Sequence, residues 1–463
     1  MLEVINEKIK KEIVSYPKVI FYTGNPYIFR TGLIGYLYEI SQLYPAILLS
    51  EKLDLETEEA LKNRELFPKL EEIIPVNYFT LPRMNLFSKN RYLYNLAKNV
   101  IQKYKPDIVV STNDLCLFEL YLMRFAKRIN SLKITIQPSN IRDSVSITKW
   151  VDLINANLRF PPFLPFKLRL FLVKCRKYFG HFLYYWILPL SVGEKPFFGK
   201  SSYILRKGNS GMRDADYQIV FSKRDYDIYL KDGVPAKKLY ILPHPLARKT
   251  KEFFRKVYFN KFKKYKGDTK VISLMLPEDT ALGFEKENFS LISKKKREKT
   301  WIEIIKLINK ILSGWKIYVK PHPDTKNFNQ IKENFKSLSE NIKVVNPQEP
   351  ADKYIEIGDI IIGLPLSAST ALFTASLQCS EKPIISLDFH QEFLGDYYKD
   401  FEGIEYIDSE KSFIDILKLI RNNKYKKKQG GLKKEELRGK EFSDTVELLE
   451  YLFQKNVQKN KSL

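Results

Sequence analysis

Two patterns of apolar positions alternate along this chain, short β-branched runs and longer stripes at helical spacing. Apolar runs occur at residues 18–24 and 45–51, and between them apolar positions recur every three or four residues. The same order returns further on and predicts strands at 105–114 and 132–140 around a helix at 118–129. Alternation of this kind predicts a parallel sheet covered by helices on both faces.

Residues 214–245 continue this first unit as a strand, a helix, a Gly-Val-Pro turn and a short strand. Basic residues then dominate residues 248–270, where sheet-type periodicity is weak, and we interpret this segment as a linker. A second alternation begins at residue 271 and ends in a closing helix, for which Ser443 is a suitable N-cap. The runs predicted as strands in this half are 271–279, 315–324, 341–347, 354–370, 383–388 and 402–408.

These patterns predict an α/β protein of two doubly wound, Rossmann-like domains that face a central cleft, the arrangement called GT-B. Residues 1–247 would form the acceptor-side domain, and residues 271–463 the domain that binds a nucleotide sugar, because the nucleotide usually binds the C-terminal half of a GT-B fold. A length of 463 residues with 44% hydrophobic residues is sufficient for two cores.

One stretch of the first unit, residues 158–192, breaks the alternation because aromatic and leucine side chains are mixed with cations. Its longest uncharged apolar run, residues 182–190, is shorter than the roughly 18 residues that a spanning helix needs. Apolar groups beside cations are typical of a segment that lies at a membrane interface. We therefore expect contact with an anionic membrane surface, with a buried connection as the alternative. The cations concerned are Lys167, Arg169, Lys174, Arg176 and Lys177.

The formal net charge of +24 favours an anionic partner. Nucleic acid is disfavoured, because no RNP-type aromatic strand, helix-turn-helix pattern or zinc module accompanies the cations. Cys116, Cys175 and Cys379 lack metal or disulfide spacing, and the first residues lack a signal-peptide pattern. We expect a cytoplasmic protein that is peripheral at the inner face of the membrane.

The sequence YVKPHPD at 318–324 holds His322 between two prolines. Each proline fixes its own φ and biases the preceding residue towards extended conformations, so Lys320 and His322 are both restrained. Neither proline can donate a ladder hydrogen bond, so the strand has to end here. A histidine just beyond the carboxyl end of a strand lies where open α/β sheets bind ligands, and an ordinary turn with a solvated imidazole is the alternative.

Polar side chains also follow the next two predicted strands. Glu349 follows the first, and the hydroxyl residues after the second are Ser367, Ser369 and Thr370. Because the carboxyl ends of parallel strands share one edge, we expect these groups to meet His322 and Lys320 in one crevice. A carboxylate suits ribose hydroxyls, hydroxyls and helix N-terminal amides suit phosphate, and the two basic side chains would neutralise a departing phosphate.

The order of KPHPD, carboxylate and PLSAST resembles the His-Pro and Ser-Ser/Thr motifs of bacterial sialyltransferases and polysialyltransferases, and more loosely those of related capsule and lipopolysaccharide transferases. The resemblance covers about residues 270–390. It implies that His322 contacts the phosphate of a CMP leaving group and that Glu349 holds the cytidine ribose. It further implies that Ser367 and Ser369 bind phosphate. UDP-sugar epimerases and other GT-B enzymes carry similar His-Pro elements.

The general base is not indicated by this resemblance, because the acidic-acidic-Gly motif of those sialyltransferases has no counterpart here. Asp114, at the end of a predicted strand, is the candidate that could deprotonate an acceptor hydroxyl, with Asp143 in reserve. An N-cap role is the alternative for Asp114. No Asp or His pair at a strand end has metal-ligand spacing, so we expect no metal and no cofactor beyond the nucleotide-sugar substrate.

The loop after the first strand, TGNPYIFRTGLIGYL, has glycines, but not at dinucleotide-binding spacing. In a GT-B fold such a loop faces the acceptor or the donor phosphate, which makes Arg30 and Gly32 candidates for binding either one. His244 in LPHP is interpreted as part of a hinge, with a role in the site as the alternative. His181 and His390 are interpreted as surface or packing residues.

The leading hypothesis is an inverting, metal-independent glycosyltransferase. It would move a sugar, with sialic acid from a CMP donor favoured, onto a surface polysaccharide or a lipid-linked glycan. The alternatives are a UDP-sugar or CDP-glycerol transferase and a UDP-sugar 2-epimerase of similar fold. A nucleic-acid-binding protein is the distant alternative.

Overall fold

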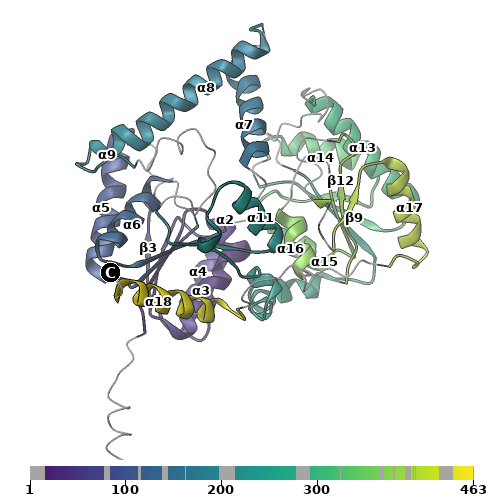
Figure 1. The fold of residues 1–463 in the computed structure, drawn as a ribbon. Helices are drawn as coiled ribbons and strands as arrows, with labels where there is room; N and C mark the ends of the chain where they lie inside the picture. Colours follow the sequence, from purple (N-terminus) through teal and green to yellow (C-terminus); the bar gives the residue numbers. More distant parts are fainter. Residues whose placement is uncertain are drawn as a thin grey trace, which may run out of the picture. The chain divides into compact units, whose positions relative to one another are not determined.

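The computed structural model describes residues 16–77, 84–112, 116–137, 144–161, 163–197, 214–277, 292–323, 325–364, 370–378, 381–391, 398–399, 401, 403–426 and 442–461. The chain divides into two compact units, Met1–Pro245 with Leu437–Leu463, and Leu246–Glu436. Each unit contains one parallel sheet with flanking helices (Figure 1), which confirms the predicted α/β fold of two Rossmann-like domains.

The first unit has a sheet in the order β3-β2-β1-β4-β5-β6-β7, and all its pairings are parallel. Strands β1, β2, β4 and β5 are buried along their whole length, which explains why they read as continuous apolar runs. The strand order reverses between β1 and β4, the position where such sheets bind ligands. The strands are β1 (Val19–Thr23), β2 (Ala46–Ser50), β3 (Leu70–Pro75), β4 (Ile108–Ser111), β5 (Leu132–Ile136), β6 (Tyr217–Val220) and β7 (Leu239–Ile241).

The helices of the first unit include a helical pair that comprises the unusual segment 158–192. The helices are α2 (Pro26–Ile28), the π-helix η1 (Phe29–Leu33), α3 (Ile34–Leu43), α4 (Leu55–Lys62), α5 (Leu86–Tyr104), α6 (Leu117–Arg128), α7 (Ser144–Arg159), α8 (Phe166–Phe182), the π-helix η2 (Leu183–Ile187), α9 (Leu188–Leu190), α11 (Lys223–Lys231), the 3-10 helix η3 (Ala236–Lys238) and α18 (Thr445–Lys461). None of the helices described in the structure is both long and apolar enough to cross a bilayer.

The closing helix α18 lies against α3 of the first unit (Figure 1), whereas the sequence pattern placed it with the C-terminal domain. The backbone N–H of Thr445 donates to Glu39 Oε2 at 3.0 Å, and the Thr445 hydroxyl donates to the same oxygen. An apolar helix face does not specify which sheet it will cover, so periodicity alone gave the wrong partner. The cap also differs by one residue, because Asp444 Oδ1, not Ser443, accepts from the N–H of Glu447 at 3.0 Å.

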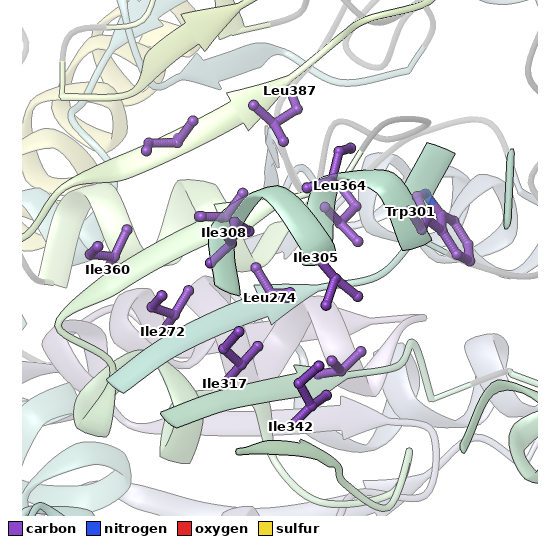
Figure 2. Packing of buried hydrophobic residues seen from close by; sticks show 14 of the residues in the cluster. Ile272, Leu274, Trp301, Ile305, Ile308, Ile317, Ile342, Ile360, Leu364 and Leu387 are labelled. Atoms are coloured by element: carbon purple, nitrogen blue, oxygen red, sulfur yellow. The ribbon is translucent and has the colours of Figure 1, made fainter. Parts of the chain in front are cut away.

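The second unit has a six-stranded parallel sheet in the order β10-β9-β8-β11-β12-β13. Its core forms where α13 packs on the sheet, and Figure 2 shows Ile305 and Ile308 of this helix above Ile272, Leu274 and Ile317. The strands are β8 (Val271–Met275), β9 (Lys316–Lys320), β10 (Ile342–Val344), β11 (Ile360–Gly363), β12 (Ile384–Leu387) and β13 (Glu405–Ile407). The helices are η4 (Pro245–Ala247), α12 (Lys251–Phe254), η5 (Arg255–Phe259), η6 (Asn260–Tyr265), α13 (Lys294–Ile311), α14 (Phe328–Lys336), α15 (Ala351–Ile357), α16 (Thr370–Gln378) and α17 (Glu410–Arg421).

Two expectations about the second unit need correction. The basic segment 248–270 is no linker but three short helices that carry buried aromatic residues and pack against α15. Its lysines concealed this pattern, since they stay at the surface while Phe254, Tyr258 and Phe262 are buried. The run 354–370, interpreted as one strand, divides into the end of α15 and strand β11, because Gly358 ends the helix in an extended conformation.

Candidate functional site

The His-Pro segment lies at the carboxyl edge of the second sheet, as expected. Strand β9 ends at Lys320, which is in register with Met275 of β8. The neighbouring strand on the other side, β10, pairs Val344 with Val319, and the loop after it begins with a hydrogen bond from the N–H of Val345 to Val319 O at 3.0 Å. His322 and Glu349 therefore follow two adjacent strands at one edge of the sheet.

Lys320 joins these two loops. Its side chain is only 3% exposed, and its Nζ donates to Pro321 O at 2.6 Å and to Pro347 O at 2.8 Å. Burial lowers its pKa to about 8, although the charge of Glu349 partly opposes that shift. The expectation for Lys320 was direct contact with a phosphate, whereas the structure directs its ammonium group at two backbone carbonyls. Lys320 therefore acts on the site by positioning the loops.

Gln348 provides a second connection between the same loops, one that the sequence did not suggest. Its Nε2 donates to Pro323 O at 2.9 Å, while its own N–H donates to Asn346 Oδ1 at 2.9 Å. The backbone of His322 lies between these two connections, and its carbonyl accepts from the N–H of Thr325 at 3.0 Å. His322 is thus held on both sides, and its side chain is partly exposed. A polar residue in a loop gives no periodic signal, so only the tertiary contact identifies it.

Glu349 is oriented by the first turn of α15. Its Oε2 accepts from Tyr354 OH at 2.6 Å and from Lys353 Nζ at 2.7 Å. Burial opposes the charged form, but the hydrogen bonds from Lys353 and Tyr354 outweigh it and lower the pKa of Glu349. Burial and the bond to Glu349 raise the pKa of the Tyr354 hydroxyl. The result is an ionised carboxylate of fixed direction whose side chain remains 35% exposed, as a ribose-binding group requires.

The hydroxyl cluster after β11 is only partly within the described residues. Ser367 and Ser369 lie outside them, and Thr370 is the first residue of α16, although its side chain is not described. In the sheet, β8 lies between β9 and β11, so strands that are consecutive in the chain are not all neighbours. Two strand spacings separate β9 from β11, roughly 10 Å. Convergence of these hydroxyls with His322 stays a prediction.

A further group of polar residues gathers at this edge and was missed by sequence reasoning. Thr300 Oγ1 of α13 lies 2.9 Å from His390 Nε2, and His390 follows β12. One turn earlier, the buried Arg297 places its guanidinium 5.3 Å from the ring centroid of Trp301. The helix was expected from residue 300, but it begins at Lys294 after the N-cap Ser293. The Ser-Lys-Lys-Lys start could have indicated this cap.

The loop after β1 in the first unit uses its two candidates for packing. Arg30 Nη1 lies 2.9 Å from Asp54 Oδ1, and Arg30 Nη2 lies 2.9 Å from Glu56 Oε2 at the start of α4. Gly32 lies directly against His244, since a Cβ at Gly32 would be 2.3 Å from His244 Nε2. These contacts give both candidates structural roles, and binding of a phosphate or acceptor by either one stays untested.

Buried carboxylates also lie at the carboxyl edge of the first sheet. Glu51 follows β2, Glu119 belongs to α6, and each is less than 5% exposed. Burial, followed by the charges of these two groups, raises the pKa of Tyr22 on β1. The base candidates Asp114 and Asp143 fall outside the described residues, so their assignment stays a prediction. Within those that are described, no cluster of His, Cys, Asp and Glu is arranged to hold a metal ion.

The chain resembles solved nucleotide-sugar epimerases in fold. The UDP-GlcNAc 2-epimerase from Methanocaldococcus jannaschii superimposes with a TM-score of 0.57 at 13% identity, over 94% of this chain and 99% of that one. The enzyme from Neisseria meningitidis, solved with UDP-GlcNAc, gives a TM-score of 0.55 at 13% identity, over 95% and 100%. The Rickettsia bellii enzyme gives 0.53 at 14%, over 97% and 99%.

Identities this low establish a shared fold and no more. No family model matches the sequence, and no curated protein matches it. The domain architecture expected from the sequence is therefore confirmed as that of GT-B-like epimerases, whereas the expected likeness to sialyltransferases finds no support in these comparisons.

Proposed function

We propose that the second unit binds the nucleotide of a UDP-sugar and that the protein is a nucleotide-sugar enzyme, with epimerisation at C2 of the sugar as its reaction. The observation that carries this proposal is the pair of joined loops at the edge of β9 and β10, which presents His322 and Glu349 together. The likeness to UDP-GlcNAc 2-epimerases over nearly the full length of both chains supports a UDP-sugar ahead of the CMP donor expected from the sequence.

Each group has a chemical role in this proposal. The ionised carboxylate of Glu349 accepts hydrogen bonds from ribose hydroxyls. His322 contacts the diphosphate, together with the N-terminal amides of α16, which are oriented to bind an anion. Lys320 and Gln348 keep the two loops at a fixed spacing, so the site is formed before the nucleotide arrives.

Nucleotide binding is tested by isothermal titration with UDP, CDP and CMP. UDP should bind most tightly, and Glu349→Gln should weaken it about tenfold or more, since a hydrogen bond to a charged group contributes about 1.5–3 kcal/mol. Glu340→Gln is the matched control, because Glu340 is exposed and precedes β10 at the opposite edge of the same sheet. Equal binding by the two variants would exclude Glu349 from the site, and a preference for CMP would restore the sialyltransferase hypothesis.

The reaction is tested by incubation with UDP-GlcNAc in D2O. Inversion at C2 breaks the C2–H bond and returns a proton to the other face, so an epimerase leaves deuterium at C2 of the nucleotide sugar. A second candidate, transfer of the sugar to a lipid-linked or surface glycan, is favoured by the exposed apolar and cationic helix α8. Transfer would release UDP without deuterium at C2, and nuclear magnetic resonance distinguishes the two results.

A further inference from the structure

Helices α7 and α8 of the first unit form a hairpin, and one face of α8 holds it together (Figure 1). Arg169, Val173 and Lys177 share this face because they are four residues apart. Arg169 Nη1 donates to Asn157 Oδ1 at 3.0 Å, Val173 is buried, and Lys177 Nζ lies 3.4 Å from Asp152 Oδ1. Two of the five cations expected to meet lipid are therefore occupied within the hairpin.

The face of α8 turned away from α7 exposes large apolar side chains. Phe171 is 60% exposed and Phe179 is 68% exposed, far more than core residues of a folded unit. Phe182 and Trp186 stack with ring centroids 5.9 Å apart, so the stripe continues into η2. The exposed apolar residues of this stripe are Leu168, Phe171, Tyr178, Phe179, Phe182 and Trp186.

The remaining cations of α8 flank this stripe. Lys167 and Lys174 lie seven residues apart on one side of it, Arg176 lies on the other, and all three are exposed. No Asp or Glu occurs between Leu153 and Gly193, so nothing within this stretch neutralises them. The exposed surface of the hairpin is thus both apolar and cationic.

The base of the hairpin is fixed in the first unit. Leu188 is fully buried in the core of that unit, and its carbonyl accepts from Asn90 Nδ2 at 2.7 Å. Asn90 Oδ1 accepts in turn from Tyr121 OH at 2.8 Å. After the hairpin, the buried Glu194 pairs with Arg128 at 2.7 Å. These contacts fix the end of the exposed surface, which reduces the entropy cost of docking.

We infer that α8 and η2 form a docking surface for an anionic lipid bilayer, separate from the proposed nucleotide site. The aromatic stripe enters the acyl boundary, and Lys167, Lys174 and Arg176 meet lipid phosphates. A second copy of this chain is a poor occupant, because a two-fold contact through this face would bring the three cations against themselves. The helix lies along the surface, since no helix among the described residues can span a bilayer.

Vesicle co-sedimentation of the full chain tests this inference. The wild type should bind phosphatidylcholine vesicles with about 30% phosphatidylglycerol, and bind pure phosphatidylcholine weakly. The triple variant Lys167→Gln, Lys174→Gln, Arg176→Gln should lose at least tenfold in partitioning, from a contribution of about one decade or less per cation. The matched control is Lys306→Gln, Lys310→Gln, Lys418→Gln, which removes the same charge from exposed positions of α13 and α17.

Two further measurements separate a specific surface from general attraction by net charge. Phe171→Ser with Phe179→Ser should also reduce binding, and Trp186 fluorescence should shift to the blue on vesicles, with Trp186→Phe as the spectral blank. Lys177→Gln should reduce binding less than Lys174→Gln, because Lys177 is paired with Asp152. Equal loss in the control triple variant would overturn the inference. So would dimers in light scattering that the serine variant abolishes, or no Trp186 shift.

Discussion

The buried ammonium group of Lys320 should make the stability of the second unit depend on pH in a definite direction. Its pKa falls from 10.5 to about 8 on folding, chiefly through burial. Between these two values the unfolded chain holds the proton more tightly than the folded one, so this lysine adds stability as the pH rises. At 1.36 kcal/mol for each unit, roughly 3 kcal/mol is withheld below pH 8, and about 2 kcal/mol returns between pH 7 and pH 9.5.

Lys320→Met isolates this effect from other titrating groups. Methionine has a similar length and cannot titrate, so the free energy of unfolding of the wild type minus that of the variant should rise by about 2 kcal/mol between pH 7 and pH 9.5. Urea unfolding at both pH values measures this difference, taken from the transition that the substitution shifts. Lys316→Met is the control, since Lys316 is an exposed lysine of the same strand. A difference that stays constant or falls with pH would refute the buried, charged lysine.

Three other substitutions follow from the contacts. Gly32→Ala forces a methyl group onto His244 and should lower the free energy of unfolding by about 1–3 kcal/mol, while Gly180→Ala, which meets nothing within 4 Å, should be neutral or slightly stabilising; equal effects in urea would contradict the packing. Gln348→Leu should raise the dissociation constant for UDP several-fold with little change in melting temperature, because it loosens an exposed loop; unchanged titration would refute that. Asn90→Ala should cost about 1–3 kcal/mol in the urea unfolding of the first unit, and no change there would count against the fixed hairpin base.

The sequence by itself determined the local elements and their order. Buried parallel strands such as β1 and β4 appear as β-branched runs because both of their faces are covered. The two prolines around His322 end β9 whatever surrounds them, so the place of this histidine beyond a strand was predictable. Short strands with alternating burial, such as β3, gave a weaker pattern.

Only the tertiary structure decided which elements meet. The helix α18 crosses back to the first unit, and the segment 248–270 belongs to a core, because an apolar face indicates burial but not its partner. The role of Lys320 was decided by the position of Pro347 O, which no local rule supplies. Charge and spacing marked α8 as unusual, yet only its packing on α7 separates the cations that hold the hairpin from those that face outward, since a sequence records the side chains but not their neighbours.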